Sequence, residues 1–541
     1  MLSKNSAPAY GPLAILFVAL SLSIGWGVRG NWGHEYGAML PGALAAMAAV
    51  LVSGRDDWQR RIGFFAFFGA LGWSFGGSIS YMQVIAFTHS GDSPSVLYGM
   101  ACLFLIGFIW AAFGGAGTAL PAFLNRQRLT ETLIPVFFVF LAWFAQDRFF
   151  DVYLGGLQDQ VGSGAITQEQ FEAQTAWIDW NDTDWIGVLV AAAAALVLAV
   201  VRSRVCWGTS LILHMCGGWW LGFTVLTVGL HLRMTPPRGD NWSGALGMMI
   251  GMFVFLYRQK EWGIAWTSLA TGFFGGLGFS GATLVKLVLV YPGFQQQVFG
   301  REVSTNWHSV LEQTFGFISG IGVALAMAYL STRAPRTSEE PLVRRWAEPA
   351  TVLFVLLVVS YVNIVKNLEA MWFPANVVAP ELYGISTYVW FRIAYAALGI
   401  AIAVPMLRYW NGHSVEILPA SRLGKGQLIY VVLLWWIVIA NLMRTTPFAE
   451  QRLITEGVIH LSACACTLLA LLLPSRERAA ELQLEPDYLT LIKRFAASLA
   501  LVMVIIVVAE FALVRALWGD TFAGHAAKHI RFGPEKTATE K

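Results

Sequence analysis

The chain has 541 residues, of which 56% are hydrophobic and only 13% are charged. A soluble domain carries about 25% charged residues, so the composition excludes an ordinary soluble fold and indicates an all-α polytopic membrane protein. The formal net charge of +3 is small, and the basic residues are spread over short loops. We therefore expect contact with membrane lipids and no binding of nucleic acid.

Apolar stretches follow one another along the whole chain, and many have the length of about 17–25 residues that crosses a bilayer. We predict about fifteen transmembrane helices, the first of which is retained and not removed as a signal peptide. Their approximate ranges are 11–28, 37–54, 62–87, 98–124, 132–150, 184–202, 206–231, 243–257, 263–291, 308–331, 349–366, 388–407, 427–443, 455–474 and 490–517.

Basic residues alternate between successive loops. The segments 55–61 and 333–345 are basic, whereas the loops at 88–97 and 151–183 contain no Lys or Arg. Because positive loops stay in the cytoplasm, the pattern predicts a cytoplasmic N-terminus and, with an odd number of spans, an outward C-terminus. The loop at 444–454, which carries Arg444 and Arg452, departs from this alternation. We expect an integral protein of a bacterial cytoplasmic membrane.

An internal repeat is indicated by matching segments at matching intervals. Residues 67–74 (FFGALGWS) and 273–280 (FFGGLGFS) are identical at six of eight positions, and Gly-Ala-Gly at 115–117 corresponds to Gly-Ile-Gly at 320–322. We therefore predict two parallel six-helix repeats, 1–205 and 206–415, related by an axis along the membrane normal. Three additional C-terminal helices with an outward tail occupy 416–541.

Small residues recur along the predicted helices of both repeats. Gly69, Gly72, Gly76 and Gly77 are spaced to share one helix face, and Gly275 and Gly278 repeat part of that pattern. In lipid, helices associate where small residues let their backbones approach closely. The pattern predicts tight packing, and the alternative is that these helices line a cavity.

The long outer loop predicts a short helix and an aromatic cluster. Thr167 and Gln170 have the spacing of a capping box. Trp177, Trp180 and Trp185 alternate with Asp and Asn. We interpret these tryptophans as an interfacial aromatic belt, and the alternative is a surface that stacks on a sugar.

Two related runs carry the candidate functional residues: Gly25–Gly37 (GWGVRGNWGHEYG) and the segment 229–242. Arg29 and Arg233 occupy corresponding positions, and two guanidinium groups could clamp a carboxylate, phosphate or sugar acid. Alternatively, each snorkels to the headgroups or pairs with Glu35 or Asp240. The predicted substrate-binding residues are Arg29, Asn31, His231, Arg233, Arg238, Asp240 and Asn241.

His34 and Glu35 are predicted to couple transport to protons, because both side chains can titrate near neutral pH. Other ionisable residues of the same outer layer are Lys286, His308, Glu312, Lys366, Glu369, Arg392, His460 and Glu510. His214 lies deeper, and we interpret it as a core histidine.

No metal site or cofactor is expected. The two runs contain no pair of histidines at ligand spacing. The cysteines at 102, 206, 216, 464 and 466 lie in or beside apolar segments and are interpreted as packing residues. His525 and His529 in the tail are four residues apart, but no carboxylate lies beside them.

The sequence favours a secondary-type transporter or permease for a small polar solute, anionic or sugar-like, bound at the interface of the two repeats. The six-plus-six plan is similar to that of the major facilitator superfamily, but the family's loop motif is matched only out of register by residues 54–61, and the chain is not assigned to it. The alternatives are a membrane-embedded glycosyl- or acyltransferase at the outer face and a structural subunit with partners not identified. In the enzyme alternative, His34 or Glu35 would be the general base and Arg29 and Arg233 would hold an anionic donor. The favoured transporter has no catalytic residues. No nucleotide loop or nucleophile elbow is present, so an ATP-driven mechanism is not expected.

Overall fold

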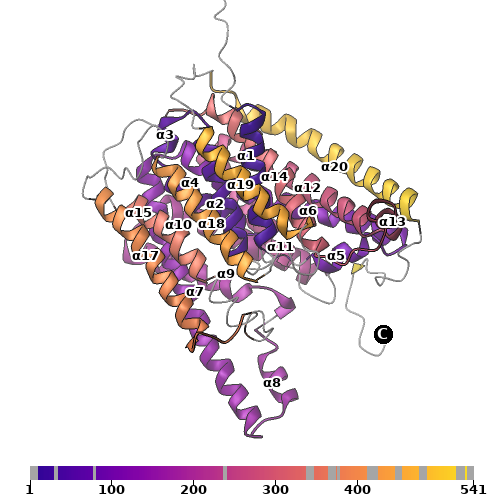
Figure 1. Cartoon of the computed structure of the whole chain (residues 1–541). Coiled ribbons are helices and arrows are strands. Elements are labelled where there is room, and N and C mark those ends of the chain that lie inside the picture. The colour runs from indigo at the N-terminus through magenta and orange to yellow at the C-terminus, as the bar shows by residue number, and fades with distance from the viewer. Residues whose placement is uncertain are drawn as a thin grey trace, which may run out of the picture. The chain divides into compact units, whose positions relative to one another are not determined.

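The computed structural model describes residues 10–29, 35–76, 79, 81–178, 180–234, 241–336, 346–362, 373, 378–410, 424–444, 454–473, 484–519 and 531–532. Within these ranges the protein contains 19 α-helices and four strands of two residues each (Figure 1). The prediction of an all-α fold is therefore confirmed.

Many of the helices suit a bilayer. Over the described ranges, eight helices are long and apolar enough to cross a membrane, and six shorter apolar helices have 10–17 residues. The chain is accordingly an integral membrane protein of the α-helical class. The count of about fifteen spans, the two repeats and the domain boundaries at 205 and 415 stay predictions.

The helices form two compact units, each drawn from separated parts of the chain. Unit 1 contains residues 1–77, 103–124 and 262–519, and unit 2 contains residues 78–102, 125–261 and 520–541. The helix α6 (Ser93–Phe123) begins in unit 2 and continues into unit 1. The other elements of unit 1 are α1 (Pro12–Arg29), α2 (Glu35–Leu51), α3 (Asp56–Gln59), α4 (Ile62–Ser74), α12 (Trp262–Val290), α13 (Pro292–Phe299), α14 (Trp307–Ser331), α15 (Ala347–Leu353), the π-helix η3 (Phe354–Val359), β2 (Glu381–Leu382), β3 (Ile385–Ser386), α17 (Thr387–Trp410), α18 (Lys425–Arg444), α19 (Glu456–Leu472) and α20 (Tyr488–Trp518).

The centre of unit 1 is the helix α1, which packs against α2, α14 and α19 (Figure 1). Glycine makes the closest of these contacts possible. A methyl carbon on Gly320 of α14 would lie 2.7 Å from the Cα atom of Ala19, and one on Gly25 of α1 would lie 2.3 Å from the Cα atom of Pro41. The backbones approach too closely there for any side chain.

Glycine contacts also join the neighbouring helices of unit 1. A methyl carbon on Gly69 of α4 would lie 2.8 Å from the carbonyl oxygen of Gly42, and one on Gly72 would lie 2.4 Å from that of Phe113. Gly275 of α12 meets Gly107 of α6 in the same way, at 2.3 Å. These contacts are the tight packing that the spacing of the small residues predicts.

Two buried arginines, Arg55 and Arg61, bind backbone carbonyls at helix ends of unit 1. The guanidinium of Arg55 donates to both carboxylate oxygens of Asp57, at 2.7 and 2.6 Å, and to backbone carbonyls after α14, including that of Ala334 at 2.9 Å. Arg61 donates to the carbonyl of Leu124 after α6, at 2.9 Å. Since the last carbonyls of a helix have no partner inside it, these buried side chains cap the two helices.

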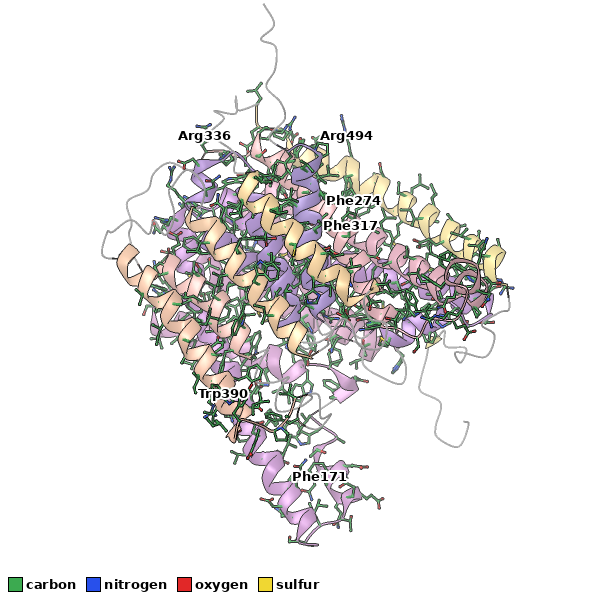
Figure 2. The ribbon with its side chains drawn as sticks, in the orientation of Figure 1. Phe171, Phe274, Phe317, Arg336, Trp390 and Arg494 are labelled. Atoms are coloured by element: carbon green, nitrogen blue, oxygen red, sulfur yellow. The ribbon has the colours of Figure 1, made fainter. Side chains whose placement is uncertain are left out.

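One end of unit 1 carries other basic residues. Figure 2 shows that Arg336, which follows α14, and Arg494 of α20 lie at one end of this unit. Trp390 of α17 lies away from that end and donates from its indole nitrogen to the carbonyl of Leu382, at 3.0 Å. Leu382 and Ile385 pair in the β2–β3 hairpin, whose turn residues Tyr383 and Gly384 have positive φ angles.

Unit 2 contains closely packed helices of its own. Its remaining elements are α5 (Met82–Phe87), α7 (Arg126–Gly162), α8 (Gln168–Thr175), the 3-10 helix η1 (Trp180–Asp182), α9 (Trp185–Val201), α10 (Trp207–Gly222), the π-helix η2 (Phe223–Gly229), β1 (Leu232–Arg233), α11 (Asn241–Gln259) and β4 (Arg531–Phe532). Gly218 of α10 and Gly247 of α11 approach so closely that a methyl carbon on either would lie within 2.2 Å of the other's carbonyl oxygen. Strand β1 pairs antiparallel with β4.

The predicted capping box of the long loop is confirmed. The backbone N–H of Thr167 donates to the side chain of Gln170 at 2.8 Å, and the N–H of Gln170 donates to the hydroxyl of Thr167 at 3.2 Å. Elsewhere in unit 2, Glu261 accepts from Arg128 at 2.9 Å. Partial burial raises the pKa of Glu261 from its ordinary value, and Arg128 opposes that rise.

The glycine contacts predict a contrast between two positions of α12. Gly275→Ala should destabilise the protein by about 1–3 kcal/mol, because its methyl group enters the space of Gly107. Gly281→Ala should be neutral or stabilising by up to about 1 kcal/mol, since its methyl group has no neighbour nearer than 4.0 Å. Thermal midpoints in detergent would compare them, and equal midpoints would contradict the packing.

Candidate functional site

The first predicted site residue, Arg29, is buried at the end of α1 with 1% of its surface exposed. Its Nη1 atom donates to Oε1 of Glu312 on α14 at 3.0 Å, and the Glu312 side chain is 4% exposed. A cation at a helix C-terminus is also favoured by the helix dipole. The position is thus a buried ion pair between two membrane-length helices, α1 and α14.

Aromatic rings surround the guanidinium. The Cζ atom of Arg29 lies 5.1 Å from the ring centre of Trp26 and 5.2 Å from that of Trp110, both within the range of cation–π attraction. Trp26 in turn contacts Trp73 at 5.9 Å and Phe315 at 4.7 Å between ring centres. Such a shell lowers the local dielectric and strengthens the attraction between Arg29 and Glu312.

We call the rings of Trp26, Trp73, Trp110, Phe279 and Phe315 the aromatic cluster. They come from five different helices of unit 1, namely α1, α4, α6, α12 and α14. Phe279 and Phe315 are 5.0 Å apart, and Trp110 and Phe279 are 5.3 Å apart. The cluster therefore ties the central helices of this unit to one another.

Glu312 has another basic neighbour besides Arg29. The Nε2 atom of His308, one turn earlier on α14, lies 3.6 Å from Oε1 of Glu312. Arg29 and His308 thus approach one carboxylate oxygen, in a region where an uncompensated charge is costly.

A network of neutral and acidic side chains adjoins the ion pair. The side-chain amide of Gln313, the residue after Glu312, donates to the carbonyl of Thr455 at 3.0 Å, and Ser23 of α1 donates to the carbonyl of Gln313 at 2.9 Å. Asn306 donates to the buried carboxylate of Glu456 at 3.1 Å. The network links α1, α14 and α19 beside Arg29.

A further buried carboxyl group lies on α20. Glu510 is 6% exposed, and its helix packs against α12. Within the part of the chain that the structure describes, its Oε2 atom has no hydrogen-bond partner. Burial of such a group is costly.

Unit 2 carries several of the predicted substrate-binding residues. His231 is exposed and has a positive φ angle of 53°. Arg233 is in strand β1, and its side chain lies outside the described part of the structure. Asn241 begins α11, and its Oδ1 atom accepts from the backbone N–H of Asp184 at 3.2 Å.

The remaining predicted residues cannot be placed in the same way. Asn31, His34, Arg238 and Asp240 lie outside the described residues, and of Glu35 only the backbone, at the start of α2, is described. Because Arg29 belongs to unit 1 and Arg233 to unit 2, the pairing of the two arginines stays a prediction.

Sequence reasoning singled out Glu312 and His308 as ionisable residues of an outer layer but did not pair Glu312 with Arg29. The signal available was that Glu312 and His308 are four residues apart on one apolar helix, and a buried acid there requires a cation. The role of Trp26 was also missed. Trp26 precedes Arg29 by three residues, which places both on one face of α1.

His214, interpreted from the sequence as a core histidine, is only half-buried, and both of its ring nitrogens have a partner. Its Nδ1 atom lies 2.7 Å from the carbonyl of Ser210, and its Nε2 atom lies 3.1 Å from Arg258.

Across the described ranges, no group of three or more His, Cys, Asp and Glu side chains could hold a metal ion.

Comparison with known proteins adds no assignment, because no family model, curated protein or solved structure matches the chain.

The ion pair predicts strongly coupled substitutions. Glu312→Gln should cost about 3–5 kcal/mol of stability, because it leaves the guanidinium of Arg29 buried without a carboxylate. The double variant Arg29→Met, Glu312→Gln should cost less than the sum of the single changes, since no charge remains. Thermal midpoints of the four proteins in detergent would give the coupling energy.

The exposed pair of Arg60 and Asp56 provides a control for this double-mutant cycle of Arg29 and Glu312. Their side chains are 46% and 45% exposed, so the same cycle there should give only about 0–1 kcal/mol. Equal coupling energies in the two cycles would rule out the strong buried interaction.

Proposed function

We propose that the protein is a secondary-type transporter or permease for a small polar solute, anionic or sugar-like, and that Arg29 and Glu312 belong to its substrate site. The observation that carries this proposal is the buried ion pair between α1 and α14, two of the helices long enough to cross a membrane. Ionisable groups inside such helices are expensive and commonly mark solute or ion pathways.

The surroundings of Glu312 support exchange of partners more than a fixed structural link. His308 approaches the same carboxylate oxygen that Arg29 binds. Glu312 can therefore release Arg29 without losing all basic partners. A transport cycle needs such exchange, because a site must bind its solute and then release it.

Arg55 differs from Arg29 in the groups it binds. Its guanidinium bonds Asp57 and also the backbone carbonyls of Ser331, Ala334 and Pro335. Those carbonyls belong to a helix end that needs capping, so we assign Arg55 a structural role.

The proposal includes a topology and an arrangement of repeats. We propose that the N-terminus is cytoplasmic and the C-terminus outside, in a bacterial cytoplasmic membrane, and that two parallel six-helix repeats enclose the solute path. The alternation of basic loops and the repeated FFGxLG segments support this proposal. His34 and Glu35 are proposed to couple transport to protons.

Flux in proteoliposomes would test the function. The reconstituted protein would face an external pool of small carboxylates, phosphate, sugars and amines, and mass spectrometry would identify the solutes that enter. Arg29→Ala, Glu312→Gln and Glu35→Gln should each lower the flux of the entering solute by about tenfold or more, the effect of losing roughly 1.4 kcal/mol of interaction.

Arg60→Ala is the matched control, because Arg60 is an exposed arginine whose loss should leave the flux unchanged. Folded Arg29 and Glu312 variants with normal flux would remove the proposed site. Chemical turnover of a lipid-linked donor without solute entry would favour an outer-face enzyme. Neither entry nor turnover would favour a structural subunit.

Cysteine labelling would test the topology. In a variant lacking the five native cysteines, Ser163→Cys in the loop after α7 should react in intact cells with a membrane-impermeant maleimide. Gln259→Cys at the end of α11 should react only after the cells are permeabilised. Both positions are exposed, and the reverse pattern would invert the proposed orientation.

A further inference from the structure

Two hydrogen-bond donors in the aromatic cluster are completely buried. Trp26 and Trp73 have no exposed surface. Within the ranges that the structure describes, their Nε1 atoms have no hydrogen-bond partner. A buried polar group without a partner costs about 1–3 kcal/mol, so most such groups in proteins bind another group or a water molecule.

One of these two rings, that of Trp26, is next to the guanidinium of Arg29, and the other contacts Trp26. The rings of Trp26 and Trp73 are in contact, with 5.9 Å between their centres, and Arg29 lies over the ring of Trp26. An indole nitrogen and a guanidinium can only donate hydrogen bonds. This combination suits an acceptor-rich anion, and it disfavours a cation because Arg29 already supplies positive charge.

Glu312 now provides an anion for Arg29 but no hydrogen bond to the two indoles. Its carboxylate binds Arg29 at 3.0 Å and lies within 3.6 Å of His308. A small carboxylate or phosphate would present the same kind of oxygen atom to Arg29, with further oxygens to accept from the indoles. If it replaced Glu312, the displaced side chain could keep His308 as a partner.

We infer that the pair of Arg29 and Glu312 is the resting form of an oxyanion site, in which a small carboxylate or phosphate takes the place of Glu312 on Arg29. The inference rests on the proposed transport function and specifies the class of its solute. A neutral sugar would stack on the rings but would not replace a carboxylate.

Chemical rescue tests this inference without knowledge of the natural solute. Glu312→Ala removes the internal carboxylate, and the full-length variant in detergent would be heated with sodium acetate, sodium phosphate, glucose or ethylammonium chloride at constant ionic strength. Acetate or phosphate should raise its thermal midpoint. At ten times the Kd, the ratio of folded to unfolded protein should rise about tenfold, and glucose and ethylammonium should have no effect.

Asp57→Ala is the matched control, since it removes the carboxylate partner of another buried arginine, Arg55. Arg55 caps a helix end and is not assigned a ligand, so the anions should not rescue this variant. Equal rescue of both variants would overturn the inference, because it would reflect a general salt effect. No rescue of Glu312→Ala by either anion would also overturn it.

Wild-type protein provides a second measurement that does not depend on the folding of Glu312→Ala. Acetate or phosphate should stabilise the wild-type protein at higher concentrations than the variant, because each must compete with Glu312, and Arg29→Met should abolish the effect. Absence of stabilisation in both proteins would contradict the site.

The two anions distinguish a carboxylate from a phosphate solute. Anion binding without flux would leave the oxyanion site in place and reject transport. Flux of a sugar or amine, without stabilisation of the protein by acetate or phosphate, would support transport and reject the oxyanion site.

Discussion

Close approach of helix backbones is the constraint on which the rest of unit 1 depends. Helices in lipid gain no hydrophobic drive from contact with one another, so they associate where small residues allow dense packing. Glycines of these helices also leave space for the large aromatic rings of the site. Trp110 lies against Gly76, and Trp73 lies against Gly42 and Gly114. Tryptophans of neighbouring helices can therefore meet around Arg29 because the facing surfaces have no side chains.

The aromatic cluster and the ion pair are interdependent. The rings keep Arg29 and Glu312 away from solvent, which makes their attraction strong and makes an unpaired charge costly. The charge on Arg29 in turn attracts the electron-rich faces of Trp26 and Trp110. A substitution in the aromatic cluster therefore alters the strength of the ion pair, and loss of either charge alters the packing of the rings.

Much of the fold could be predicted from local patterns, and the partners of the site could not. Apolar length predicted membrane helices, glycine spacing predicted close packing at Gly69 and Gly275, and residue spacing predicted the capping box at Thr167. The contact of Arg29 with Glu312 joins residues 283 positions apart. Periodicity along one helix does not specify which distant helix faces it, so sequence reasoning chose nearer acids as partners.

The arginines at the end of unit 1 have a consequence for biogenesis. Arg55 and Arg61 belong to the basic loop that we expect to stay in the cytoplasm during insertion, and both side chains are buried at helix ends in the folded protein. The same two residues can thus first hold their loop in the cytoplasm and then bind helix ends in the folded protein. Moving either charge to another loop would leave the carbonyl groups of a helix end without their arginine partner.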